Sequence, residues 1–148
     1  MSDHRVQLEW RPRADDDFAA GEYQREHRWR FSGGLEIEGT AAPDYGGSEK
    51  LPNPEEALVA AVASCHLLTF LAIAQRRGLI VAAYDCEGVG TLGKNDDGRM
   101  AVTRIRLVPR IEFAGETPDA AALEKLHASA HRNCFIANSI SCPVDIEA

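Results

Sequence analysis

The chain has 148 residues, of which 45% are hydrophobic and 26% are charged, and its formal net charge is −7. This length fits one domain over residues 1–148 that buries most of its apolar surface in a single core. The negative charge excludes the basic face that a nucleic-acid partner requires. The polar residues 1–5 do not resemble a signal peptide, so we expect a cytoplasmic protein.

Alternation of apolar and polar residues predicts the strands of the N-terminal third. One strand is predicted over residues 6–10, and a pair of strands with a tight turn is predicted on either side of Gly33 and Gly34. Proline and glycine then mark residues 41–52 as a loop.

A long apolar helix is predicted after this loop. Asn53 suits the N-cap, Pro54 suits the first helical position, and Gly78 suits the stop. Residues 57–74 are nearly uncharged and approach the length of a membrane span. Because the segment is rich in alanine and carries polar side chains, we expect a central helix buried on nearly all faces, and no membrane partner.

The second half of the chain predicts two strands, a helix and a final strand. The strands cover residues 80–89 and 103–113, with a hairpin turn at 95–98 between them. A second helix runs from 117 to about 132, and a short strand covers 144–146. This order predicts an α+β domain with helices packed on an antiparallel sheet.

Two of the four cysteines suggest redox chemistry. Cys65 lies midway along the apolar helix and Cys134 follows the second helix, and such a pair suits peroxide reduction, with one thiolate attacking and the other thiol resolving. Only a thiolate attacks, and burial opposes its formation. A cation is therefore expected near Cys65. Arg25, Arg28 and Arg30 are candidates, with Glu55 as a candidate for the carboxylate that orients the arginine.

The helix geometry constrains this site. Ten residues of helix separate Glu55 from Cys65 by ~15 Å along the axis, so the two side chains cannot touch within one straight helix. Either the arginine spans part of the gap or Glu55 comes from a second chain. This favours a site at a dimer interface.

Other interpretations of the same residues remain open. Cys65 and Cys134 also suit buried core positions, and Cys86 and Cys142 are interpreted as incidental core residues. His66 is not assigned as a base, because adjacent helical residues point ~100° apart.

A metal site is a further alternative. His127, His131 and Cys134 are spaced i, i+4 and i+7, and all three are zinc ligand types.

Two sequence runs resemble a known family. The run NPEE at residues 53–56 with Cys65 ten residues beyond Glu55, and the run AHRNCFIANS at residues 130–139, resemble the OsmC/Ohr family of osmotically inducible and organic hydroperoxide resistance proteins. The resemblance covers nearly the whole chain. It implies the OsmC-like fold, an intertwined homodimer with two sites at its interface.

The resemblance also implies a function. It implies a thiol-dependent peroxidase that reduces organic hydroperoxides, with Cys65 as the peroxidatic cysteine, Cys134 as the resolving one, and Glu55 orienting Arg25, or alternatively Arg28. No bound cofactor is implied; an external dithiol, such as dihydrolipoamide on a lipoylated protein, restores the thiols.

Two departures point to a divergent subgroup of the family. Phe135 stands where the organic hydroperoxide branch has proline, and His66 follows the first cysteine. A thiol enzyme of other specificity, or a non-catalytic small-ligand-binding or structural dimer, are therefore alternatives. Cys86 or Cys142 could also replace Cys134 as the resolving thiol.

Overall fold

The computed structural model describes all 148 residues. They divide into two compact units, Met1–Ala57 and Leu58–Ala148. The division falls within the first turn of the long helix α1 (Pro54–Arg76). The expectation of a single domain stays a prediction.

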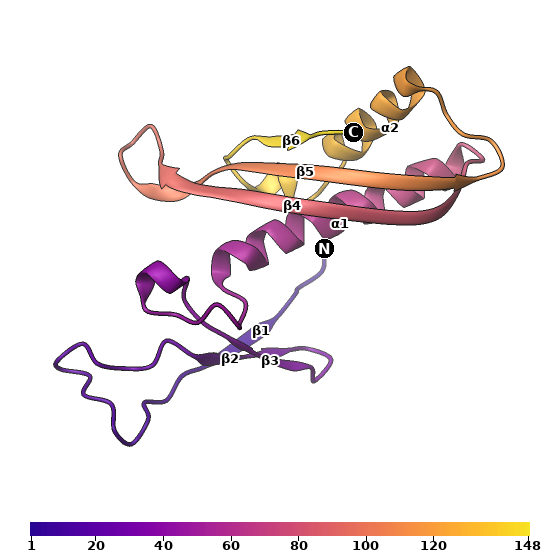
Figure 1. Ribbon diagram of the computed structural model, residues 1–148. Coiled ribbons are helices and arrows are strands. Elements are labelled where there is room, and N and C mark those ends of the chain that lie inside the picture. The colour runs from indigo at the N-terminus through magenta and orange to yellow at the C-terminus, as the bar shows by residue number, and fades with distance from the viewer. The chain divides into compact units, whose positions relative to one another are not determined.

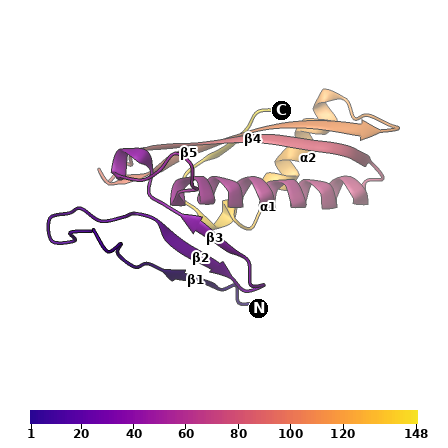
Figure 2. The same cartoon turned by 60° about the horizontal axis from the view of Figure 1, so that its bottom comes forward.

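The first unit contains a small antiparallel sheet. Its strands are β1 (Val6–Glu9), β2 (His27–Phe31) and β3 (Glu36–Gly39), which lie side by side in that order (Figure 2). The turn between β2 and β3 contains Gly34 with φ 91°, a conformation that glycine adopts without a steric penalty. The predicted strand and strand pair are confirmed, and a single 3₁₀ turn, η1 (Pro43–Tyr45), lies in the predicted loop.

Helix α1 begins and ends where its flanking residues predict. Asn53 Oδ1 accepts a hydrogen bond from the backbone N–H of Glu56 at 2.9 Å, and Asn53 Nδ2 donates to Glu56 Oε1 at 2.9 Å. Pro54 is the first helical residue. Gly78, just beyond the end, has φ 73°, which suits the residue that terminates a helix.

One face of α1 is buried and the opposite face is open. The buried residues repeat every four positions, as one side of a helix does: Val62, His66, Phe70 and Ala74. On the other side Leu68 is 62% exposed. Within a single chain, α1 is therefore not buried on nearly all faces, contrary to our expectation. By length and composition alone α1 could cross a membrane, but the core helices of soluble proteins pass the same test.

The second unit contains a three-stranded sheet and the second helix. The hairpin of β4 (Ile80–Lys94) and β5 (Met100–Ala114) runs along α1, and β6 (Val144–Ile146) pairs with β5 (Figure 1). The pairing of β5 with β6 is parallel, so the prediction of a wholly antiparallel sheet is wrong. Side chains along a strand alternate between the two faces of a sheet whether the neighbouring strand is parallel or antiparallel. The alternation in the sequence therefore could not predict that β6 runs parallel to β5.

Helix α2 (Ala120–Arg132) begins at Asp119, whose Oδ1 accepts from the backbone N–H of Ala122 at 2.8 Å. A short 3₁₀ turn, η2 (Ala137–Ser139), follows it. The predicted helix is thus confirmed, together with its cap.

Two groups of buried side chains hold the helices of the second unit on its sheet. The first joins α1 and α2 and consists of Phe70, Ala74, Leu126 and Ala130. The second joins α1 and β5 and consists of Val62, Ile105 and Leu107. The two groups contact α1 before and after Cys65 in the sequence, and they therefore fix the position of the helix on both sides of this residue.

Candidate redox site

The structure brings the two cysteines of interest together in the second unit. Cys65 lies on the half-buried side of α1, and Cys134 lies two residues beyond the end of α2 with an exposed fraction of 1%. The two side chains are neighbours, and each shifts the pKa of the other. Both are free thiols. Two thiols in direct contact can be joined by one disulfide bond.

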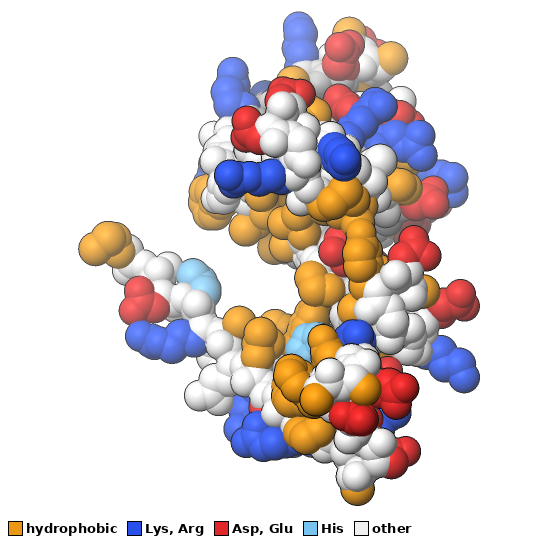
Figure 3. Space-filling view, turned by 90° about the vertical axis from the view of Figure 1, so that its left-hand side faces the viewer, with side chains coloured by type: hydrophobic (Ala, Val, Ile, Leu, Met, Phe, Trp, Pro, Cys, Tyr) orange, Lys and Arg blue, Asp and Glu red, His pale blue; other side chains and the backbone are white.

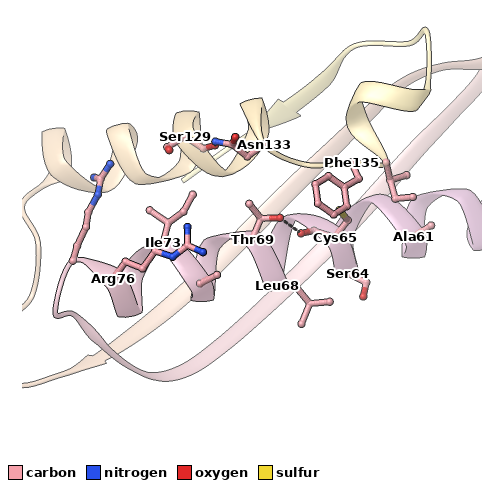
Figure 4. Close-up of a pocket in the computed structure, with 13 residues that line it drawn as sticks. Ala61, Ser64, Cys65, Leu68, Thr69, Ile73, Arg76, Ser129, Asn133 and Phe135 are labelled. Atoms are coloured by element: carbon pink, nitrogen blue, oxygen red, sulfur yellow. Dashed lines mark hydrogen bonds between the residues drawn. The ribbon is translucent and has the colours of Figure 1, made fainter. Parts of the chain in front are cut away.

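The surroundings of Cys65 favour its thiolate. Burial opposes ionisation, but the backbone N–H groups of Ile136 and Phe135 and the thiol of Cys134 point at its sulfur. These donors outweigh burial, and the pKa of Cys65 lies below its ordinary value. Thr69 Oγ1 also donates to the carbonyl oxygen of Cys65 at 2.8 Å (Figure 4).

Cys134 has the opposite character. Burial is the main reason that the pKa of Cys134 is raised, and the neighbouring Cys65 raises it further. The backbone N–H of Ala137 donates to Cys134 Sγ at 3.4 Å. The two environments therefore push the pKa values of two neighbouring thiols apart, with that of Cys65 lowered and that of Cys134 raised.

An open apolar groove of about 800 Å³ borders Cys65. Figure 4 shows Cys65, Leu68 and Ile73 of α1 on one side of the groove. Ser129 of α2 and Asn133, just beyond the end of α2, lie on the other side. Phe135 lies beside Cys65 and is 79% exposed. A molecule with an apolar body could therefore reach the Cys65 sulfur along this groove.

Glu55 and Arg25, the other two predicted site residues, belong to the first unit. Glu55 Oε2 is buried and has no hydrogen-bond partner. Arg25 lies with its guanidinium carbon 3.7 Å from the ring centroid of Tyr23, and donates to the Tyr23 carbonyl oxygen. The structure contains no ion pair between Arg25 and Glu55, so it does not assemble this predicted pair.

Arg28, the alternative arginine, has a different partner. Its Nε lies 3.6 Å from Glu36 Oε2 on the neighbouring strand. Arg30 shares the same carboxylate, at 2.5 Å. Arg28 is therefore already paired, whereas Arg25 has no carboxylate partner.

The alternative metal site is not assembled. His127, His131 and Cys134 do not form a group that could hold a metal ion, and no other three His, Cys, Asp or Glu side chains do so. The reason is that His127 turns into the core, where its Nδ1 bonds His66, while Cys134 faces Cys65.

The buried pair of His66 and His127 was not predicted. The signal in the sequence was the position of His66 in the buried four-residue repeat of α1, between Val62 and Phe70. That repeat places the imidazole in the core. The partner, 61 residues away, has no local signal.

Cys86 and Cys142 pack on the core group around Val62 and Ile105. Burial raises the pKa of Cys86. Both positions agree with the interpretation of these cysteines as core residues.

The comparisons with known proteins agree with this fold. The model of the OsmC-like protein family matches residues 47–148, more than half of the chain. An OsmC-like protein of unknown function from Vibrio cholerae is 41% identical, over 99% of both chains, with a TM-score of 0.96. No curated protein matches the chain.

Two solved organic hydroperoxide resistance proteins are more distant. One from Elizabethkingia anophelis is 16% identical, over 99% of this chain and 93% of its own, with a TM-score of 0.73. One from Bacillus subtilis is 18% identical, over 99% and 96%, with a TM-score of 0.69. At these identities the likeness shows the α+β fold alone. The family match over residues 47–148 and the 41% identical relative from Vibrio cholerae establish that the chain belongs to the OsmC-like protein family.

Proposed function

We propose that this protein is a thiol-dependent peroxidase that reduces organic hydroperoxides to alcohols. The observation that carries the proposal is the contact between Cys65, whose pKa is lowered, and Cys134, whose pKa is raised. One thiolate poised to attack, beside a protonated thiol, is the arrangement that a two-cysteine peroxidase needs.

The cycle has three steps. The Cys65 sulfur bonds to the outer peroxide oxygen while the O–O bond breaks, and the alkoxide takes a proton and leaves as the alcohol. Cys65 is now a sulfenic acid, and the peroxide is reduced. The Cys134 sulfur then attacks the Cys65 sulfur, the S–O bond breaks, and the oxygen leaves as water. An external dithiol reduces the disulfide by exchange and becomes a disulfide itself.

The groove beside Cys65 supports an organic substrate. Its walls are largely apolar side chains such as Leu68, Ile73 and Phe135, which suit an alkyl or aryl group better than hydrogen peroxide. The reductant is proposed to be a dithiol such as dihydrolipoamide on a lipoylated protein, in the cytoplasm, where thiols are kept reduced.

We further propose that the working form is a homodimer. Leu68 and Phe135 beside Cys65 are 62% and 79% exposed in the single chain, and Figure 3 shows other hydrophobic side chains at the surface. A second copy laid over the open face of α1 would cover Leu68. The unpartnered oxygen of Glu55 supports its role as the acid that orients Arg25.

A non-catalytic function also has one observation in its favour. The apolar groove of about 800 Å³ is large enough to hold a small apolar ligand without any reaction at Cys65. In that case the two thiols would be inert core residues.

Peroxide consumption separates these functions. With dihydrolipoamide as reductant, we expect the wild type to consume cumene hydroperoxide faster than hydrogen peroxide. Cys65→Ser should abolish turnover, and Cys134→Ser should lower it strongly, while the matched variant Cys86→Ser should leave it unchanged. No turnover by the wild type, with Cys65 still reduced after a slight excess of peroxide, would favour the ligand-binding function instead.

A further inference from the structure

Two histidines form a hydrogen-bonded pair inside the second unit. His66 Nε2 lies 3.1 Å from His127 Nδ1, and the rings are parallel within 9°, with centroids 5.4 Å apart. Both side chains are buried, with exposed fractions of 1% and 4%. The pair therefore joins α1 to α2 within the core.

Apart from a third histidine, His131, whose charge acts on His66, the neighbours of the pair are mostly apolar. The Phe70 ring packs on His127 with centroids 4.7 Å apart, and Tyr84 of β4 packs on Phe70 in turn. The outer nitrogens, His66 Nδ1 and His127 Nε2, have no partner. Two apolar side chains in these positions would form an equally stable or more stable core. A polar pair retained in such a place is best explained by specificity, since buried polar pairs can fix a single register between packed helices.

The two histidines lie close in sequence to the two thiols, so the register of α1 against α2 also affects the positions of Cys65 and Cys134. His66 directly follows Cys65 on α1, and His127 precedes Cys134 by seven residues, the last two of which lie beyond the end of α2 at Arg132. A hydrogen bond tolerates only a few tenths of an ångström in length, whereas a slide of α2 by one residue moves it ~1.5 Å along its axis. The pair thus fixes where Cys134 lies relative to Cys65.

We propose that His66 and His127 are positioning residues that hold Cys134 against Cys65 for disulfide formation. The inference rests on the proposed function for its place in the peroxidase cycle, at the resolving step. The positioning itself needs no peroxide. With oxidised dithiothreitol, the two thiols give up two electrons and two protons to form the disulfide, and dithiothreitol is reduced to its dithiol.

The test is the equilibrium between this cysteine pair and dithiothreitol, which measures how well the two thiols are placed. Three variants are compared with the wild type: His127→Leu, which removes the hydrogen bond; His127→Asn, which keeps a polar atom close to the place of Nδ1; and His66→Leu with His127→Leu, which leaves no unpaired histidine. The matched control is His131→Leu, the same substitution one turn along α2. Circular dichroism and urea unfolding establish that each variant is folded.

We expect the equilibrium constant for disulfide formation to fall at least about tenfold in His127→Leu and in the double variant, since a displacement of about 1 Å costs reacting groups up to ~10²-fold. His127→Asn should recover most of the loss, and His131→Leu should stay within about twofold of the wild type. In a single turnover with cumene hydroperoxide, oxidation of Cys65 should keep its rate, and only the formation of the disulfide should slow.

A folded double variant with the wild-type equilibrium constant would overturn the inference, as would an equal loss in His131→Leu. Failure of the proposed function has a different signature. In that case the wild type does not react with cumene hydroperoxide, yet the ranking of the variants against dithiothreitol still tests the positioning.

Discussion

The close approach of α1 to β4 gives a stability prediction at Gly90. A Cβ atom added at Gly90 would lie 2.6 Å from Cγ2 of Val59 on α1, and one added at Gly88 would lie 2.7 Å from Cγ1 of the same valine. Carbon atoms in ordinary contact are 3.5–4.0 Å apart. Val59 cannot move aside easily, because a β-branched side chain in a helix has one strongly preferred rotamer. The Gly90→Ala substitution must therefore push α1 away from the sheet by about 1 Å.

The expected magnitude follows from two opposing effects. Overpacking of this kind destabilises the folded state by about 1–3 kcal/mol. Replacing glycine also reduces the conformational freedom of the unfolded chain, which stabilises the folded state by about 0.4–1 kcal/mol. We expect Gly90→Ala to lower the free energy of unfolding by about 1–2 kcal/mol. Gly93→Ala is the matched control, since its Cβ would lie 3.8 Å from Thr103, and it should be neutral or slightly stabilising.

Urea unfolding at equal protein concentration measures both variants, because the stability of a dimer depends on concentration. Combining Gly90→Ala with Val59→Ala removes the clash, so the double variant should be more stable than the sum of its single changes predicts. If Gly90→Ala were as stable as Gly93→Ala, α1 would not lie this close to β4, and the placement of Cys65 on it would need revision.

Three more predictions concern the core, the thiols and the proposed dimer. Burial, and then repulsion from the neighbouring histidines, lower the pKa of His66 from 6.5 to about 4. Between these pH values the unfolded chain therefore binds more protons than the folded one. The free energy of unfolding should fall by up to about 3 kcal/mol as the pH drops from 6.5 to 4. Urea unfolding across this range should show a flatter pH dependence for His66→Leu, and an equal slope would contradict the assignment. Iodoacetamide at pH 7 should alkylate Cys65 at least about tenfold faster than Cys134, as peptide mass analysis can follow; comparable rates would refute the division of roles. Leu68→Asp should convert the proposed dimer to monomers in analytical ultracentrifugation, since a charge would replace an apolar contact, and an intact dimer would place the interface elsewhere.

Local signals predicted the elements of this fold well. Asn53, Pro54 and Gly78 set both ends of α1, because each residue acts on the backbone next to it. Asp119 set the start of α2 in the same way. The strands were predicted by alternation, although β4 and β5 extend to the turn at Asn95 and are longer than expected.

What the sequence did not predict depends on contacts between distant segments. The parallel direction of β6 is set by the path of the chain after α2 and not by residues within the strand. The open face of α1 is apolar in sequence like the buried face, so composition alone could not tell which side a single chain covers.

Part of the candidate site was predicted from the sequence, and part of it depends on contacts between distant residues. The resemblance to the OsmC/Ohr family identified Cys65 and Cys134 as a pair, and the structure places their side chains in contact. The backbone N–H groups of Phe135 and Ile136 that favour the thiolate were not predicted, because any residue supplies such a donor. The partner of Glu55 remains a prediction, since Arg25 contacts Tyr23 in the structure.

The most direct test of the central claim is the product of a single turnover. One equivalent of cumene hydroperoxide is added to the reduced protein, remaining thiols are blocked, and disulfide-linked peptides are identified by mass spectrometry. We expect a disulfide between Cys65 and Cys134, absent in Cys65→Ser, with Cys86 and Cys142 blocked as free thiols. Recovery of all four cysteines as blocked thiols, or oxidation that spares Cys65, would contradict it.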